Sequence, residues 1–196
     1  MANTNQSVLK WAQTALLAAL CYVAFTFLQI KIPMPGGDAT SIHIGNAFCV
    51  LAALLLGGPC GGLAGAVGMT IGDLLDPVYV PLVPKTLFCK LLIGLITGFV
   101  AHRIGGITTT DDPKHILRWT IIAAACGLIF NMFADPIIGY WYKILILGKP
   151  AADLSLKINF VATTINAVVS LVVSVAVYAA LRPALQKAGF FMKLTH

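Results

Sequence analysis

Residues 44–75 read IGNAFCVLAALLLGGPCGGLAGAVGMTIGDLL, two apolar runs that only the Gly-Gly-Pro turn at 57–59 separates. So tight a turn holds no polar loop, and its glycines and proline are typical of one helix ending where the next begins. A helix with a stripe of glycines lets another helix backbone approach closely within a membrane. The stretch therefore predicts a helical hairpin in a lipid bilayer. The second run carries that stripe at Gly61, Gly65, Gly68 and Gly72.

The rest of the chain is also apolar. Of its 196 residues, 59% are hydrophobic and only 10% are charged, whereas soluble domains average about 25% charged residues. A membrane-crossing helix needs about 20 apolar residues, so the length allows about six crossings and little else. We predict an all-α membrane protein, a bundle of six transmembrane helices that forms a single transmembrane domain over residues 1–196. The predicted spans are 8–28, 44–57, 59–75, 85–104, 117–147 and 156–182.

The charge distribution predicts the orientation. The net charge of +6 requires no nucleic-acid partner, because the cytoplasmic loops of membrane proteins are normally basic. Six spans place both termini on one side, and the basic loop 102–118 favours the cytoplasmic side for them, an N-in/C-in arrangement in a bacterial plasma membrane. The outer side then receives 29–43, 76–84 and 148–153.

No recognisable catalytic or metal-binding motif is found in the sequence. It lacks nucleotide-binding and hydrolase motifs, so we expect no enzymatic activity, no cofactor and no metal. The five cysteines lie in apolar runs without a CxxC pair, which indicates small reduced core residues. A lipid-modifying enzyme is an alternative that the loop-like spacing of its candidate residues disfavours. Those candidates are His102, Asp111, Asp112 and His115.

Ionisable residues within spans are costly and are therefore candidates for function. Asp73 ends the third span, where the helix macrodipole disfavours a carboxylate, so we expect a cation or a ligand donor beside it. Lys90 is suitably placed to pair with Asp73, either as a structural ion pair or in a ligand site. Lys85 is expected to snorkel to the interface.

The fifth and sixth spans carry further polar candidates. Asn131 and Asp135 precede Pro136, which predicts a broken helix whose carbonyls face a cavity. Residues 140–142, Tyr-Trp-Tyr, form either an interfacial aromatic belt or a surface that stacks on a flat ligand. The sixth span has a polar stripe that serves interhelical hydrogen bonding or ligand contact, and its two asparagines are the preferred ligand contacts. The stripe consists of Asn159, Thr163, Asn166 and Ser170.

The first outer loop, 32–43, is too long and too rich in proline, glycine and polar residues for a plain hairpin. It is typical of a lid. His43 and Asn46 follow at the start of the second span, where they are candidates to donate to a ligand. His43 has the alternative role of an interfacial or capping residue.

These features together resemble the substrate-binding S components of energy-coupling factor (ECF) transporters for vitamins. The likeness rests on the A-x-x-x-A spacing of Ala15 and Ala19, on the loop and glycine hairpin that run from 32 to 73, and on Pro84-Lys85 with the later asparagines. In that family the first motif docks on a scaffold subunit. The resemblance covers nearly the whole chain.

The resemblance implies high-affinity capture of a water-soluble vitamin or precursor in an outward-facing pocket under the first loop. It also implies partners, a transmembrane scaffold (T) subunit and two ABC ATPases. The mixed donors suit a pyridoxine-type, pyrimidine or flavin compound, with a cobalamin-type ligand as an alternative. The predicted substrate-binding residues are His43, Asn46, Asp73, Lys90, Asn131, Asp135, Tyr140, Asn159 and Asn166.

A self-sufficient secondary transporter or channel is the alternative function. In it, Asp73, Lys90 and Asp135 would move protons or ions. Many secondary transporters contain an inverted repeat, and no such repeat is evident between the halves of this sequence.

Overall fold

Six helices and one β-hairpin make up the computed structural model, which describes residues 2–34, 37–148 and 152–191. Strands β1 and β2 connect the first two helices, a 3-10 turn at Val80–Leu82 precedes the fourth, and a π-helical turn at Phe99–Ile104 extends it. The elements are α1 Ala2–Phe27, β1 Gln29–Met34, β2 Asp38–His43, α2 Gly45–Leu56, α3 Gly58–Leu74, α4 Val83–Gly98, α5 Pro113–Leu145 and α6 Ala152–Lys187.

The predicted helices all form, but they are unequal in length. Four helical segments are long and apolar enough to cross a membrane, and α2 is a shorter apolar helix of 12 residues. At 1.5 Å per residue α2 is only ~18 Å long, less than the ~30 Å of a hydrocarbon core. A crossing by all six helices therefore stays a prediction. The four segments are Gln6–Phe27, Val80–Ile104, Pro113–Leu145 and Asp153–Lys187.

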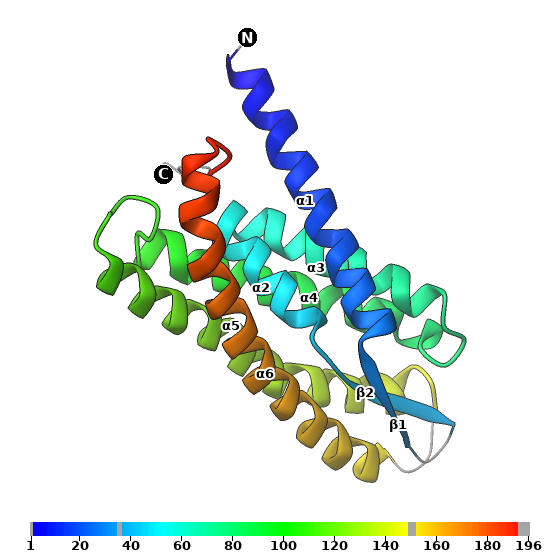
Figure 1. The fold of residues 1–196 in the computed structure, drawn as a ribbon. Coiled ribbons are helices and arrows are strands. Elements are labelled where there is room, and N and C mark those ends of the chain that lie inside the picture. The colour runs from blue at the N-terminus through cyan, green and yellow to red at the C-terminus, as the bar shows by residue number, and fades with distance from the viewer. Residues whose placement is uncertain (1, 35–36, 149–151, 192–196) are drawn as a thin grey trace.

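The helices place the β-hairpin at one end of the molecule and the described ends of the chain at the other (Figure 1). Helix α2 lies in the centre and contacts α1, α3, α4 and α6. All but one of its twelve residues are buried, which explains why it is apolar on every face.

The glycine stripe permits the close packing that the sequence predicts. A side chain at Gly61 would collide with the backbone of α2, and one at Gly68 with the backbone of α1. Gly94 and Gly98 of α4 lie directly against the backbone of α3. Helix α3 is thus clamped between three neighbours, and this confirms the predicted role of the stripe.

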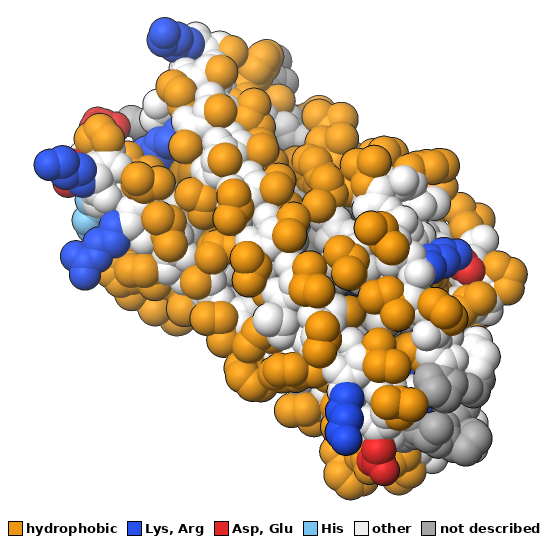
Figure 2. Space-filling model, turned by 60° about the horizontal axis from the view of Figure 1, so that its bottom comes forward, with side chains coloured by type: hydrophobic (Ala, Val, Ile, Leu, Met, Phe, Trp, Pro, Cys, Tyr) orange, Lys and Arg blue, Asp and Glu red, His pale blue; other side chains and the backbone are white. Residues whose placement is uncertain are grey.

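The molecular surface suits a bilayer. Hydrophobic side chains cover the middle of the face in Figure 2, and charged side chains gather towards its ends. All five cysteines are free and four are buried, but Cys126 is exposed. The core position predicted for Cys126 is therefore wrong: it lies on the surface of α5.

Candidate ligand-binding site

A polar cavity of about 70 Å³ lies between the β-hairpin and the adjacent ends of the helices. The hairpin, α2, α3, α4, α5 and α6 all contribute polar side chains to its wall. The sequence pattern therefore identified most of one cavity from segments far apart in the chain. Eight of the nine predicted site residues line it: His43, Asn46, Asp73, Lys90, Asp135, Tyr140, Asn159 and Asn166.

Asn131 is the predicted residue that does not line the cavity. It is buried in α5 one turn from Asp135, and its Oδ1 has no hydrogen-bond partner among the described residues. The i, i+4 spacing put the two residues on one helix face. It could not show that the cavity ends before reaching Asn131.

The ion pairing at the cavity differs from the prediction. Lys85 Nζ lies 3.1 Å from Asp135 Oδ1, and the two side chains are only 9% and 8% exposed. Lys85 therefore does not snorkel to the interface. Among the residues that the structure describes, no ion pair joins Lys90 to Asp73. Asp135 on α5 instead pairs with Lys85, which lies nearer the start of α4 than Lys90 does.

Helix α5 is continuous across Pro136, so the predicted broken helix is wrong. A proline lacks the N–H that would bond the carbonyl four residues earlier, here that of Met132. The Thr163 hydroxyl of α6 lies 3.4 Å from this oxygen and also bonds the Asn159 carbonyl at 2.8 Å. Packing against α6 thus shelters the carbonyl without a break in the helix.

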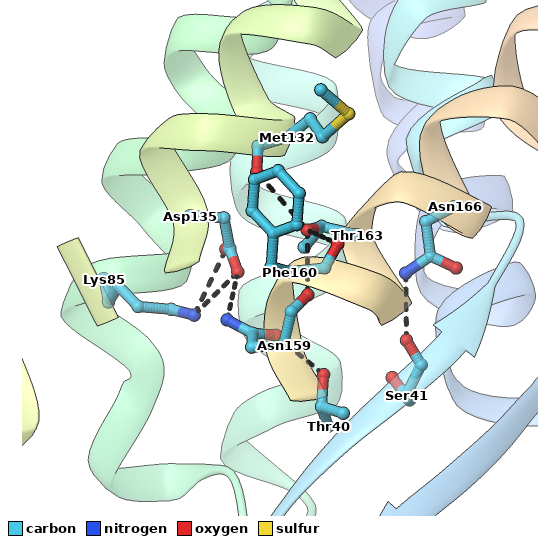
Figure 3. Close-up of polar contacts among 9 residues, drawn as sticks. All are labelled: Thr40, Ser41, Lys85, Met132, Asp135, Asn159, Phe160, Thr163 and Asn166. Atoms are coloured by element: carbon cyan, nitrogen blue, oxygen red, sulfur yellow. Dashed lines mark hydrogen bonds and ion pairs between the residues drawn. The ribbon is translucent and has the colours of Figure 1, made fainter. Parts of the chain in front are cut away.

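The two asparagines of α6 bind the β-hairpin (Figure 3). Asn166 Oδ1 accepts the backbone N–H of His43 at 2.9 Å, and its Nδ2 donates to the carbonyl of Ser41 at 2.9 Å. Asn159 accepts from the Thr40 hydroxyl at 2.8 Å and donates to Asp135 Oδ2 at 3.0 Å. Both side chains therefore connect α6 to β2.

The predicted first outer loop folds into a two-stranded antiparallel hairpin, which the sequence analysis did not expect. Its register pairs Gln29 with His43 and Met34 with Asp38. Met34 and four residues of β2 line the cavity, so the hairpin covers it.

A buried ion pair holds the hairpin to α5, and the sequence analysis missed it. Lys143 Nζ lies 2.9 Å from Asp38 Oδ2, with side-chain exposures of 7% and 3%. Lys143 follows Asp135 by eight residues, a spacing that returns to nearly the same helix face. That spacing was the available signal. On the outer side of the hairpin, Lys31 pairs with Asp76.

His43 lies just before the start of α2 and also lines the cavity, and its role as a ligand donor stays a prediction. Its Nδ1 accepts the backbone N–H of Gly45 at 3.1 Å and so caps the start of α2, while the side chain also lines the cavity. Burial, reinforced by the charge of Lys90, lowers the pKa of His43 to about 3. The imidazole is therefore neutral, and an accepting Nδ1 leaves the proton on Nε2.

Three polar residues that line the cavity have side-chain atoms without a hydrogen-bond or ion-pair partner among the described residues. Asn46 Oδ1 and Asp73 Oδ2 are buried without a hydrogen-bond partner among the described residues. The Lys90 ammonium forms no hydrogen bond or ion pair within the described parts of the chain. Buried groups of this kind are normally satisfied, so the cavity offers two acceptors and one cationic donor.

The aromatic cluster of α5 divides between roles. Tyr140 lines the cavity, Trp141 is exposed, and Tyr142 packs against the hydrophobic core. One ring is thus placed to contact a ligand, and a place for the exposed Trp141 in an interfacial aromatic belt stays a prediction.

The predicted docking residues lie on an open face of α1. Ala15 and Ala19 are exposed, together with the larger Leu16 and Leu20. The opposite face packs on α3, where Gly68 meets Ala18. The small residues therefore leave a shallow apolar surface on the outside of the bundle.

Comparison with known proteins identifies a protein family that this chain matches. Residues 5–183 match the family model described as ECF-type riboflavin transporter, S component. Curated protein sequences give no significant match. Among solved structures, the S component for biotin from an ECF-type ABC transporter is similar, with a TM-score of 0.63 over 91% of this chain and 93% of that chain. Its sequence identity is 19%, so this likeness concerns the fold.

Proposed function

This chain belongs to the family of ECF-type riboflavin transporter S components, and we propose that it captures its vitamin in the cavity beneath the β-hairpin. The observation that carries the proposal is the set of unused polar groups there, on Asn46, Asp73 and Lys90. Leaving such groups buried is costly, and a ligand that satisfies them recovers that cost. High affinity is the expected consequence.

The chemistry of these groups favours a cyclic amide or imide edge. The amide oxygen of Asn46 and the carboxylate of Asp73 accept N–H donors, and Lys90 donates to a carbonyl. The flavin ring of riboflavin has an N–H between two carbonyls, and the ureido ring of biotin has a carbonyl between two N–H groups. The family description makes riboflavin the first candidate, and Tyr140 is placed to stack on a flat ring.

A vitamin needs more room than the cavity provides. Ligand pockets usually measure about 300–1,000 Å³, and this one measures about 70 Å³. The hairpin forms one wall and contacts the helices through side chains, whereas the other walls are packed helices. We therefore propose that the hairpin moves away from α6 to let the ligand enter and then bonds α6 again, with the cavity enlarged around the ligand.

The transport step is proposed to depend on partners. The exposed apolar face around Ala15 and Ala19 would dock on the transmembrane scaffold subunit, which would associate with two ABC ATPases. In this arrangement six helices cross the bacterial plasma membrane. Both termini face the cytoplasm, and the hairpin faces outward. The start of α1 and the end of α6 lie opposite the hairpin in Figure 1, as this arrangement requires.

Ligand binding by the purified chain in lipid nanodiscs tests the proposal. Equilibrium dialysis against riboflavin, biotin and pyridoxine should give tight binding of riboflavin. Uptake into proteoliposomes should then require the scaffold, the ATPases and ATP. Robust uptake by the chain alone would contradict the proposal and favour a self-sufficient transporter.

A further inference from the structure

We infer that Asn166 and Asn159 hold the β-hairpin closed, so that they control how fast a ligand exchanges and do not select which ligand binds. The inference rests on the proposed ligand site. It assigns the two residues a role different from direct ligand contact, which the sequence alone favoured.

Asn166 acts as an additional strand neighbour for β2. One edge of β2 pairs with β1. On the other edge the Ser41 carbonyl and the His43 N–H both bond the Asn166 amide, each at 2.9 Å. An open strand edge has unpaired backbone groups, and a side-chain amide supplies the matching donor and acceptor. Because the Asn166 side chain is buried, these bonds are shielded from water.

Asn159 connects the hairpin to the buried ion pair of Lys85 and Asp135 (Figure 3). An ionised carboxylate can only accept hydrogen bonds, so Asp135 fixes which end of the Asn159 amide faces it. The amide oxygen then points to the Thr40 hydroxyl, which donates at 2.8 Å. The α4–α5 ion pair thereby orients a bond that holds the hairpin.

These bonds occupy both ends of each amide. Asn46 differs, because it lines the cavity and its Oδ1 is buried without a partner among the described residues. A side chain that grips the hairpin affects the barrier to its movement, and ligand entry and exit both cross that barrier. A side chain that contacts the ligand stabilises the bound state and mainly slows exit.

Stopped-flow quenching of riboflavin fluorescence separates the two roles. Asn166→Leu keeps the branched shape without the amide, and Thr40→Val replaces the hydroxyl by a methyl group. Both variants should raise the association and dissociation rates together, each about tenfold for Asn166→Leu. The dissociation constant should change less than about threefold. Asn46→Ala is the matched control and should raise only the dissociation rate.

Hydrogen exchange of the vitamin-free protein provides a readout that needs no ligand. The His43 amide should exchange faster in Asn166→Leu, whereas in Asn46→Ala it should exchange as in the wild type. If wild-type protein fails to bind riboflavin, the proposed ligand is wrong, and the exchange rates still decide whether Asn166 holds the hairpin. An increase in the dissociation rate alone, or unchanged exchange at His43, would overturn the inference. If Asn166→Leu does not fold, Thr40→Val tests the same inference.

Discussion

Replacing Asp135 by asparagine should strongly destabilise the protein. The Lys85 ammonium lies 3.1 Å from Asp135, and both side chains are at least nine-tenths buried. Asparagine keeps the shape but removes the charge, so the lysine stays buried without a counter-ion. Loss of one partner of a buried pair typically costs about 3–5 kcal/mol. We expect a decrease of that size in the free energy of unfolding.

Comparison of four proteins measures this prediction. The variant Lys85→Met with Asp135→Leu removes both charges, and its free energy of unfolding should be closer to the wild type than that of Asp135→Asn, because replacing a whole buried pair by apolar residues is often neutral. The control is Lys31→Met, which removes an exposed pair with Asp76 and should cost less than about 1 kcal/mol. Denaturant unfolding in detergent micelles, followed by tryptophan fluorescence, provides the four values. An Asp135→Asn cost as small as that of the control would refute the reasoning.

Three further predictions concern binding, transport and pH. Lys90→Met should weaken riboflavin binding more than about tenfold, or ~1.4 kcal/mol, with an unchanged unfolding midpoint; equal affinity by equilibrium dialysis would remove Lys90 from the site. Ala15→Trp should leave binding intact and block uptake by the complete transporter, because it adds bulk to the proposed docking face; loss of binding would show that this face supports the fold instead. The pKa of His43 is about 3 in the folded protein against 6.5 for the free side chain. Below pH 6.5 the unfolded chain therefore binds a proton that the folded protein does not, so the free energy of unfolding declines as the pH falls from 6.5 towards 3. Between pH 7 and 5 the wild type should lose ~2 kcal/mol of stability, and His43→Gln should lose less in thermal unfolding; parallel profiles would contradict a buried neutral imidazole.

The helices were predictable because lipid imposes strong rules on sequence. Apolar runs of membrane-crossing length, the Gly-Gly-Pro turn at 57–59 and the stripe from Gly61 to Gly72 each have a local physical meaning that needs no tertiary context. The structure confirms the helices and the close packing at the glycines. The hairpin was harder to predict, because Pro33 and the glycines that follow it weaken the strand pattern.

Candidate site residues could be predicted because ionisable and polar side chains are energetically costly in a bilayer. Their hydrogen-bond and ion-pair partners could not be predicted in this way. The pattern of polar residues predicts that Asp73, Lys90 and Asp135 lie near one another, but it does not predict the conformations of their side chains. The pairing of Lys85 with Asp135 depends on how α4 faces α5, which is a property of the packed bundle. The continuity of α5 at Pro136 likewise depends on shelter from α6. The Asp38–Lys143 pair joins segments more than a hundred residues apart, so only its α5 half had a sequence signal.

A structure of the protein with bound riboflavin is the sharpest test of where the ligand binds. We predict riboflavin beneath the closed β-hairpin, with Lys90 donating to a ring carbonyl, with Asn46 Oδ1 and Asp73 Oδ2 accepting from the ring N–H and a ribityl hydroxyl, and with the hairpin bonded to α6. Riboflavin bound elsewhere, for example in the apolar groove between α1 and α6, with these three groups still unpaired, would contradict the proposed site.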